Sequence, residues 1–135
     1  MNITGLHLKN PTILAAGIMG TTGASLIRMA REGAGAVVTK SIGPQPKEGH
    51  SNQSMVKLEG GYLNAMGLPN PSYESFLPEL EKAKDKAGVP VIASIFGGNP
   101  EEFRMVAEGL ISGKPDAFEL NVGCPHAMGY GASVG

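Results

Sequence analysis

Residues 91–113 read VIASIFGGNPEEFRMVAEGLISG, and this stretch predicts one complete unit of a strand followed by a helix. The run from Val91 to Ile95 is short and apolar, which is typical of a strand buried on both faces of a parallel sheet. Asn99, Pro100 and Glu102 stand where an N-cap, a first helical residue and a capping-box acid are expected. Strand-and-helix units of this kind build sheets whose parallel strands are joined by crossover helices.

The same alternation recurs on both sides of this unit. Three more apolar runs predict strands, and two more stretches have helical periodicity. The expected strands are Thr12 to Ala16, Ala36 to Lys40 and Ala117 to Val122, and the expected helices cover residues 24–33, 73–88 and 99–113. The sequence therefore predicts an α/β fold with a parallel sheet, in one domain at most.

One connection is too long for a compact crossover. About 30 residues, Ser41 to Asn70, separate the second strand from its helix. Long loops in compact domains are usually functional or disordered. The first half, SIGPQPKEGHSNQS, is polar and looks flexible, whereas in GGYLNAMGLPNP glycines, asparagines and prolines bracket apolar residues. We expect the second half to have a defined shape.

Composition excludes several classes of function. The 135 residues carry 11 basic and 12 acidic side chains in no run of like charge, which gives no footprint for nucleic acid or an anionic membrane surface. A single cysteine excludes an internal disulfide and fits a reducing compartment, so we expect a cytoplasmic location. The start, MNITGLHLKN, has no export signal, and no apolar run is long enough for a membrane span.

Unusual residues follow all four predicted strands. AAGIMG, TKS, SIFGG and NVGCP stand at the strand ends, where β/α barrels and open doubly wound sheets collect their chemistry. Any single glycine after a strand is more often a turn former. The coincidence at four strands indicates a ligand site at the carboxyl edge of the sheet.

Three side chains at this edge have both structural and functional interpretations. Lys40 either reaches solvent or meets an anion, and Asn121 either satisfies backbone groups or binds a ligand. Cys124 is either an inert buried thiol or, from its place in a loop between glycine and proline, a reactive one. His126 is too close in sequence to pair with it as a nucleophilic dyad usually does. Isolated histidines give no reason to expect a metal site.

Five segments together carry a family resemblance: LKNPTILAAG, VVTKSIG, GGYLNAMGLPNP, VIASIFGG and ELNVGCPH. Along its whole length the chain resembles the amino-terminal part of class 1 dihydroorotate dehydrogenases, flavin-dependent barrel enzymes of pyrimidine (UMP) biosynthesis. The resemblance implies a (β/α)8 TIM barrel of which this chain supplies about the first four strands. Residues 1–135 would then be the amino-terminal half of one FMN-binding domain, with the remaining strands supplied by another segment or chain.

The resemblance also implies a role for individual residues. The implied FMN contacts are Ala16, Gly17, Lys40, Ser41, Ser94 and Asn121. The implied substrate contacts are Lys40, Asn64, Ala65, Met66, Gly67, Leu68 and Asn121. Cys124 would be the catalytic base that removes the C5 proton of dihydroorotate while a hydride passes from C6 to FMN. Class 2 members carry serine at the base and a helical amino-terminal extension, and this sequence has neither feature.

The resemblance leaves partners and electron acceptor open. It implies dihydroorotate and orotate as ligands, and it is compatible with a homodimer and with an electron-transfer subunit that carries FAD and an iron–sulfur cluster. Two alternatives stay open as well. One is a tRNA-dihydrouridine synthase-like flavin barrel, for which a basic surface would be expected. The other is a non-catalytic half-barrel that serves as a binding or assembly module.

Overall fold

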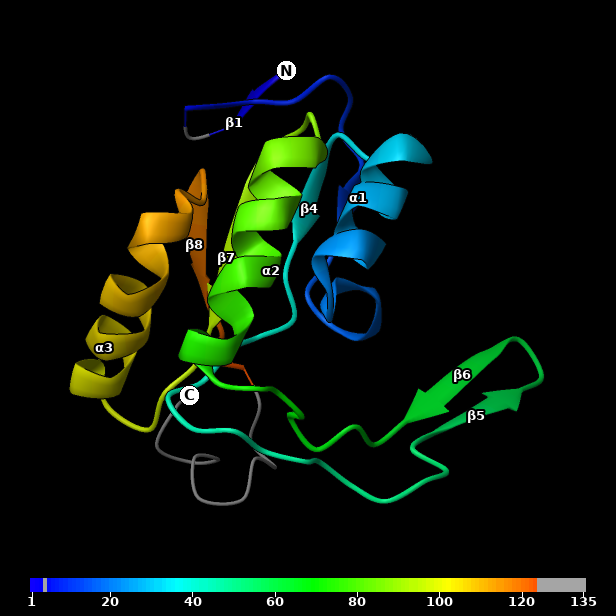
Figure 1. Cartoon of the computed structure of the whole chain (residues 1–135). Helices are drawn as coiled ribbons and strands as arrows, with labels where there is room; N and C mark the ends of the chain where they lie inside the picture. Colours follow the sequence, from blue (N-terminus) through cyan, green and yellow to red (C-terminus); the bar gives the residue numbers. More distant parts are fainter. Residues whose placement is uncertain (4, 124–135) are drawn as a thin grey trace.

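A four-stranded parallel sheet forms the centre of the computed structural model, which describes residues 1–3 and 5–123 (Figure 1). Its strands are β3 (Ile13–Leu14), β4 (Ala36–Val38), β7 (Val91–Ile95) and β8 (Ala117–Leu120), and they lie side by side in that order. Val37 pairs with Val91, and Ile92 pairs with Ala117. Each strand is therefore added beside its predecessor, and the carboxyl ends of all four meet at one edge.

Three helices cover one face of this sheet, on the near side in Figure 1. They are α1 (Gly23–Arg31), α2 (Tyr73–Lys86) and α3 (Pro100–Leu110), and short 3-10 turns lie at Ile18–Gly20 (η1) and Ile111–Gly113 (η2). The helices bury Leu26, Phe76 and Val106 against Val37 and Val91 of the strands. This layer of sheet and helices is the hydrophobic core of the described chain.

Local signals set the helix boundaries. Asn99 caps α3 as predicted, because its Oδ1 accepts a hydrogen bond of 2.9 Å from the backbone N–H of Glu102. The Glu102 carboxylate accepts from the N–H of Gly98 at 2.8 Å, one residue before the cap, and so does not close the usual capping box. Thr22 and Ser25 form a capping box at the start of α1. Each predicted helix ends two or three residues later than the observed one.

The second half of the long connection has the defined shape that we expected, because it contains β6 (Gly61–Asn64) and pairs with the residues before it. Residues 47–70 form an antiparallel ribbon, whose outer part is the hairpin of β5 (Met55–Leu58) and β6 (Gly61–Asn64). Backbone bonds continue inward from the hairpin, from Ala65 N–H to Ser54 O at 2.8 Å and from His50 N–H to Met66 O at 3.1 Å. In Figure 1 the hairpin extends away from the sheet and helices. The alternation of apolar and polar residues that predicts a half-buried strand was hard to see in this segment, because both faces of the hairpin are exposed.

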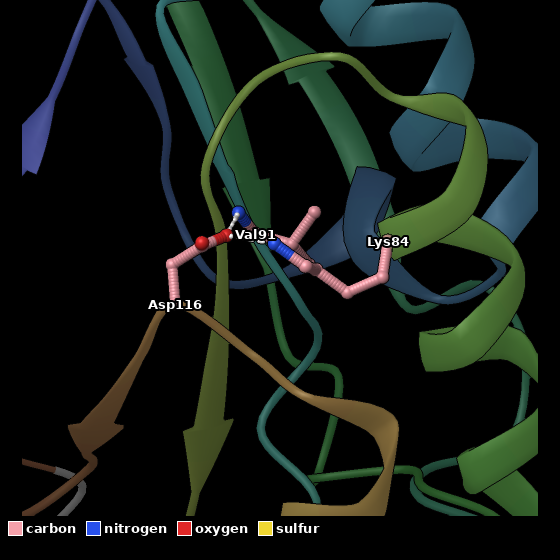
Figure 2. Close-up of polar contacts among 3 residues, drawn as sticks. All are labelled: Lys84, Val91 and Asp116. Atoms are coloured by element: carbon pink, nitrogen blue, oxygen red, sulfur yellow. Dashed lines mark hydrogen bonds and ion pairs between the residues drawn. The ribbon is translucent and has the colours of Figure 1, made fainter.

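The opposite edge of the sheet carries structural contacts that the sequence did not predict. A short hairpin of β1 (Asn2–Ile3) and β2 (Leu6–His7) lies there. At the same edge the Asp116 carboxylate joins two elements: one oxygen accepts from the N–H of Val91 and from Lys84 Nζ, each at 2.7 Å (Figure 2). No helix within residues 1–3 and 5–123 has the length and apolar character that crossing a bilayer requires.

Candidate functional site

The site begins where β4 ends, because the chain there turns two polar residues toward the carboxyl edge of the sheet. Lys40 and Ser41 follow β4 and are nearly buried, at 7% and 3% exposure. The N–H of Lys40 donates to the carbonyl of Gly20 at 2.8 Å, which ties the turn after β3 to the end of β4. A Cβ on Gly20 would lie 2.6 Å from that nitrogen, so only glycine permits this approach.

A hydrogen-bonded cluster then links three neighbouring strands. The hydroxyl oxygens of Ser41 and Ser94 are 2.9 Å apart, and Nδ2 of Asn121 donates to Ser41 Oγ at 3.0 Å. The backbone N–H of Asn121 donates to Ile95 O at 2.8 Å, which continues the pairing of β7 with β8 past its last residue. Side chains 80 residues apart in sequence thereby meet at one point.

Two adjoining cavities open over this cluster. The smaller, of about 500 Å³, is lined by Ala16, Gly17, Lys40, Ser41, Glu119, Leu120, Asn121, Val122 and Gly123. The larger, of about 940 Å³, is lined by residues 14–19, by Lys40 and by residues of the ribbon. Ala16, Gly17 and Lys40 line both cavities, so the two are parts of one continuous site. The volume of each part lies within the range of small-molecule sites.

The ribbon forms the far wall of the larger cavity. Asn64, Ala65, Met66, Gly67 and Leu68, the segment expected to contact substrate, all line it. Gly67 has φ 75°, and a Cβ there would lie 2.8 Å from the His50 ring and 2.9 Å from the His50 backbone nitrogen. The shape of this wall therefore depends on a glycine that packs directly against a neighbouring strand of the ribbon.

Sequence reasoning missed several residues of this wall. Lys47 and His50 line the larger cavity beside Lys40, and no aspartate or glutamate is among its lining residues. The wall is therefore a region of positive character, suited to an anionic ligand. The sequence contains only an indirect indication of these two residues. Both precede the NAMGLP segment in the same long connection, and the backbone pairing of the ribbon brings them opposite that segment.

Most of the predicted site residues are brought together. Ala16, Gly17, Lys40, Ser41, Asn121 and the Asn64–Leu68 segment all border the two cavities. Ser94 does not border them: it is fully buried behind Ser41 and reaches the site only through that hydroxyl. Cys124 and His126 lie outside the described residues. Within the described chain, no three His, Cys, Asp or Glu side chains are grouped so that they could hold a metal ion.

Known proteins with similar sequences share one family name. The family model for dihydroorotate dehydrogenase matches residues 1–135. The dihydroorotate dehydrogenase B (NAD(+)) catalytic subunit of Methanosarcina acetivorans is 76% identical over 135 residues, which are 99% of this chain and 43% of that protein. The subunit of the same name from Pyrococcus abyssi is 54% identical over 135 residues, 100% of this chain and 44% of that protein. The chain thus spans less than half the length of these relatives.

A solved structure supports the fold independently. The structure of DHODH from Eimeria tenella in complex with ferulenol superposes with a TM-score of 0.74 over 96% of this chain and 38% of that one, at 21% identity. A likeness at this identity concerns the fold, and it confirms that the four parallel strands and their helices are part of a β/α barrel. With the family model and the curated relatives, it confirms the resemblance carried by the motifs: the chain belongs to the dihydroorotate dehydrogenase family.

Proposed function

We propose that this protein oxidises dihydroorotate to orotate with bound FMN, in pyrimidine biosynthesis. The observation that carries the proposal is the hydrogen bond between Asn121 and Ser41 in the lining of the smaller cavity. It sets an amide that follows β8 and a hydroxyl that follows β4 in the same lining as Lys40, and Lys40 also borders the larger cavity with the Asn64–Leu68 wall. The family match favours this activity over a dihydrouridine synthase or a non-catalytic module.

The residues at the junction fit a flat, polar cofactor. Gly17 has φ 143°, and the space where its Cβ would stand has no atom within 4 Å, so a planar ring can approach the backbone there. Ser41 and Asn121 offer hydrogen bonds beside it, and Lys40 supplies a positive charge. Bound FMN would supply the hydride acceptor for C6 of dihydroorotate. These features support a flavin at the smaller cavity, with Ala16 and Gly17 against its ring.

The larger cavity suits the second ligand, a small planar carboxylate. Lys40 and Lys47 give this cavity a positive character, and His50 and Asn64 add an imidazole and an amide. Met66 and Leu68 supply apolar surface of the kind that encloses a small ring. We therefore assign substrate binding to this wall together with Lys40 and Asn121, and we expect the carboxylate to be held by charge-assisted contacts.

The proposed base is Cys124, which follows directly on the described end of the chain. A thiolate can take the C5 proton of dihydroorotate, and the residue comes three positions after Asn121 in the sequence. Asn121 itself holds Gly123 through a hydrogen bond of 3.3 Å from the Gly123 N–H to Oδ1. This contact fixes the backbone of the residue that precedes the thiol in the sequence.

We infer the electron acceptor and the assembly of this protein from the names of its relatives. Those proteins are named catalytic subunits of an NAD(+)-linked enzyme. We propose the same place for this chain, with electrons passing to a separate subunit that carries FAD and an iron–sulfur cluster, and with two catalytic subunits forming a homodimer. Closing the barrel requires about four more strand-and-helix units beside β3 and β8. We assign those units to another segment or chain.

The decisive experiment is a spectrum followed by a titration. We expect the protein whose barrel is completed by those units to be yellow when purified, and anaerobic dihydroorotate to bleach its flavin. Residues 1–135 alone should not turn over. Cys124→Ser should keep flavin and orotate binding but slow this reduction, with a deficit that shrinks as pH rises, because a hydroxyl is a weaker base than a thiol. Stopped-flow absorbance measures both.

A colourless protein, with the barrel completed, would contradict the proposal and favour a binding module. A yellow protein whose flavin dihydroorotate fails to reduce, but whose flavin is reoxidised by uridine in tRNA after chemical reduction with dithionite, as dihydrouridine forms, would favour the synthase alternative. Unchanged reduction in Cys124→Ser would remove Cys124 from the role of base while leaving the activity in place. The three outcomes are distinct, so each part of the proposal is tested separately.

A further inference from the structure

Ser94 has no direct access to the cavities, yet its hydroxyl ends the chain of hydrogen bonds that begins at Asn121. Its exposure is 0%, and among the described residues its hydroxyl has one hydrogen-bond partner, Ser41 Oγ at 2.9 Å. The oxygen of Thr39 is engaged elsewhere, accepting from the Ser94 backbone N–H at 2.9 Å and donating to the carbonyl of Lys40 at 3.0 Å. A buried hydroxyl with a single hydrogen-bond partner must donate its proton to that partner, because the proton otherwise has no acceptor.

The orientation of Asn121 is fixed independently. Its Oδ1 is 3.3 Å from the backbone nitrogen of Gly123, and a backbone N–H can only donate. Oδ1 is therefore the atom on that side, and Nδ2 is the atom that faces Ser41 Oγ at 3.0 Å. An amide nitrogen can only donate, so Ser41 accepts at this contact.

These two contacts determine what Ser41 offers to a ligand. A serine oxygen has two acceptor positions and one proton. Asn121 Nδ2 occupies one acceptor position, and the Ser94 hydroxyl, which has no other acceptor among the described residues, occupies the second. We propose that Ser94 is a positioning residue that commits the Ser41 hydroxyl to donate its proton into the smaller cavity. The ligand atom opposite Ser41 must then be a hydrogen-bond acceptor.

The inference rests on the proposed function for the identity of that ligand. The polar edge of a flavin ring presents carbonyl oxygens and ring nitrogens that accept hydrogen bonds, and a committed donor matches such an edge. A donor also stabilises the additional negative charge of the reduced ring. Ser94 would thereby influence flavin affinity and reduction potential without touching the flavin.

The test is a double-mutant cycle in the flavin-loaded protein. Ser94→Ala, Ser41→Ala and the double variant are compared for flavin dissociation constant, by fluorescence of released FMN, and for midpoint potential. We expect Ser94→Ala to weaken flavin binding about three- to tenfold, the range of one neutral hydrogen bond, and to lower the potential. In the Ser41→Ala background the same change should have no further effect on either quantity.

Two controls separate positioning from simple packing. Ser94→Thr keeps the hydroxyl and should restore affinity and potential, whereas a packing role predicts a loss from the larger side chain in a fully buried position. Ser25→Ala removes a hydroxyl from the capping box of α1 and should lower thermal stability without changing the flavin.

Additive effects of the two alanine changes, or an unchanged midpoint potential in Ser94→Ala, would overturn the inference. Flavin binding by the parent protein would still support the proposed function in that case. A parent protein without flavin would overturn both.

Discussion

The sheet-and-helix layer and the ribbon of residues 47–70 are held together by different forces. Phe76, Leu80 and Val91 of the layer are at most 1% exposed, whereas Tyr62 and Leu63 of the ribbon are 66% and 60% exposed. The layer is stabilised by buried apolar area, and the ribbon hairpin by its own backbone hydrogen bonds. The site lies where the two meet. Changes in the layer should therefore act on folding, and changes in the inner ribbon should act on the ligand.

The largest effect is expected in the layer. Phe76→Ala removes a ring from the fully packed contact between α2 and the sheet, and should lower the free energy of unfolding by about 3–5 kcal/mol. Leu63→Ala, the matched truncation in the ribbon, should change it by less than about 0.5 kcal/mol, because the side chain is already in water. Urea unfolding followed by circular dichroism measures both. Comparable losses in the two variants would show that the hairpin is buried in the protein and would remove the contrast.

A smaller effect is expected at the opposite edge of the layer, where Figure 2 shows the Asp116 carboxylate in contact with Val91 and Lys84. Asp116→Ala leaves the part-buried N–H of Val91 without its acceptor and should cost about 1–3 kcal/mol. Lys84→Met removes only the ion pair, whose side chains are 29% and 30% exposed, and should cost about 0–1 kcal/mol.

The salt dependence of the two variants sharpens this result. High salt should reduce the cost of Lys84→Met, because it screens the ion pair, and should leave most of the cost of Asp116→Ala, because a backbone hydrogen bond is lost. Equal costs that fall together at high salt would mean that the ion pair with Lys84 of α2, and not the hydrogen bond from Val91, is the main contribution of Asp116 at this edge.

The layer was predictable from sequence, and particular residues show why. Val91 to Ile95 is apolar on both faces and coincides with β7, and Asn99 caps α3 where its sequence position predicted. Burial on both faces produces an apolar run that can be seen without any partner strand. The other three strands were predicted too long, because pairing and not composition ends them. Thr12 to Ala16 stands against Ile13–Leu14, Ala36 to Lys40 against Ala36–Val38, and Ala117 to Val122 against Ala117–Leu120.

The site was predictable only in part. Lys40, Ser41 and Asn121 stand at strand ends, so their meeting followed from the topology. The position of Lys47 and His50 at the cavity could not be predicted. Backbone N–H and C=O groups make the pairing that brings them there, and those groups are the same in every sequence. Ser94 was expected to contact the ligand, but it is buried behind Ser41. This difference depends on the direction of its side chain within β7, which the sequence did not predict.

A modest change in stability, with a specific change in ligand binding, is expected at two glycines of the ribbon. Gly67 and Gly60 both have positive φ, 75° and 80°. Alanine should cost about 1 kcal/mol at either position, through left-handed strain alone. At Gly60, at the tip of the hairpin, a Cβ would meet no atom within 4 Å, so the strain is the whole effect. At Gly67 it would lie 2.8 Å from the His50 ring, so the Asn64–Leu68 wall must move.

Gly67→Ala should therefore weaken orotate binding several-fold, whereas Gly60→Ala should leave it unchanged and lose only the stability that the left-handed strain costs. Orotate titration of the flavin spectrum measures the affinity, and thermal unfolding measures the strain that both variants share. The double variant of Gly67→Ala with His50→Ala adds a direct check, because removal of the ring relieves its contact and leaves only that with the His50 backbone nitrogen, 2.9 Å away. Partial recovery of affinity would assign the wall's position to the packing of His50 on Gly67. Equal loss of affinity in the two single variants would mean that the hairpin tip and the wall move as one body, and that the ribbon acts on the ligand along its whole length.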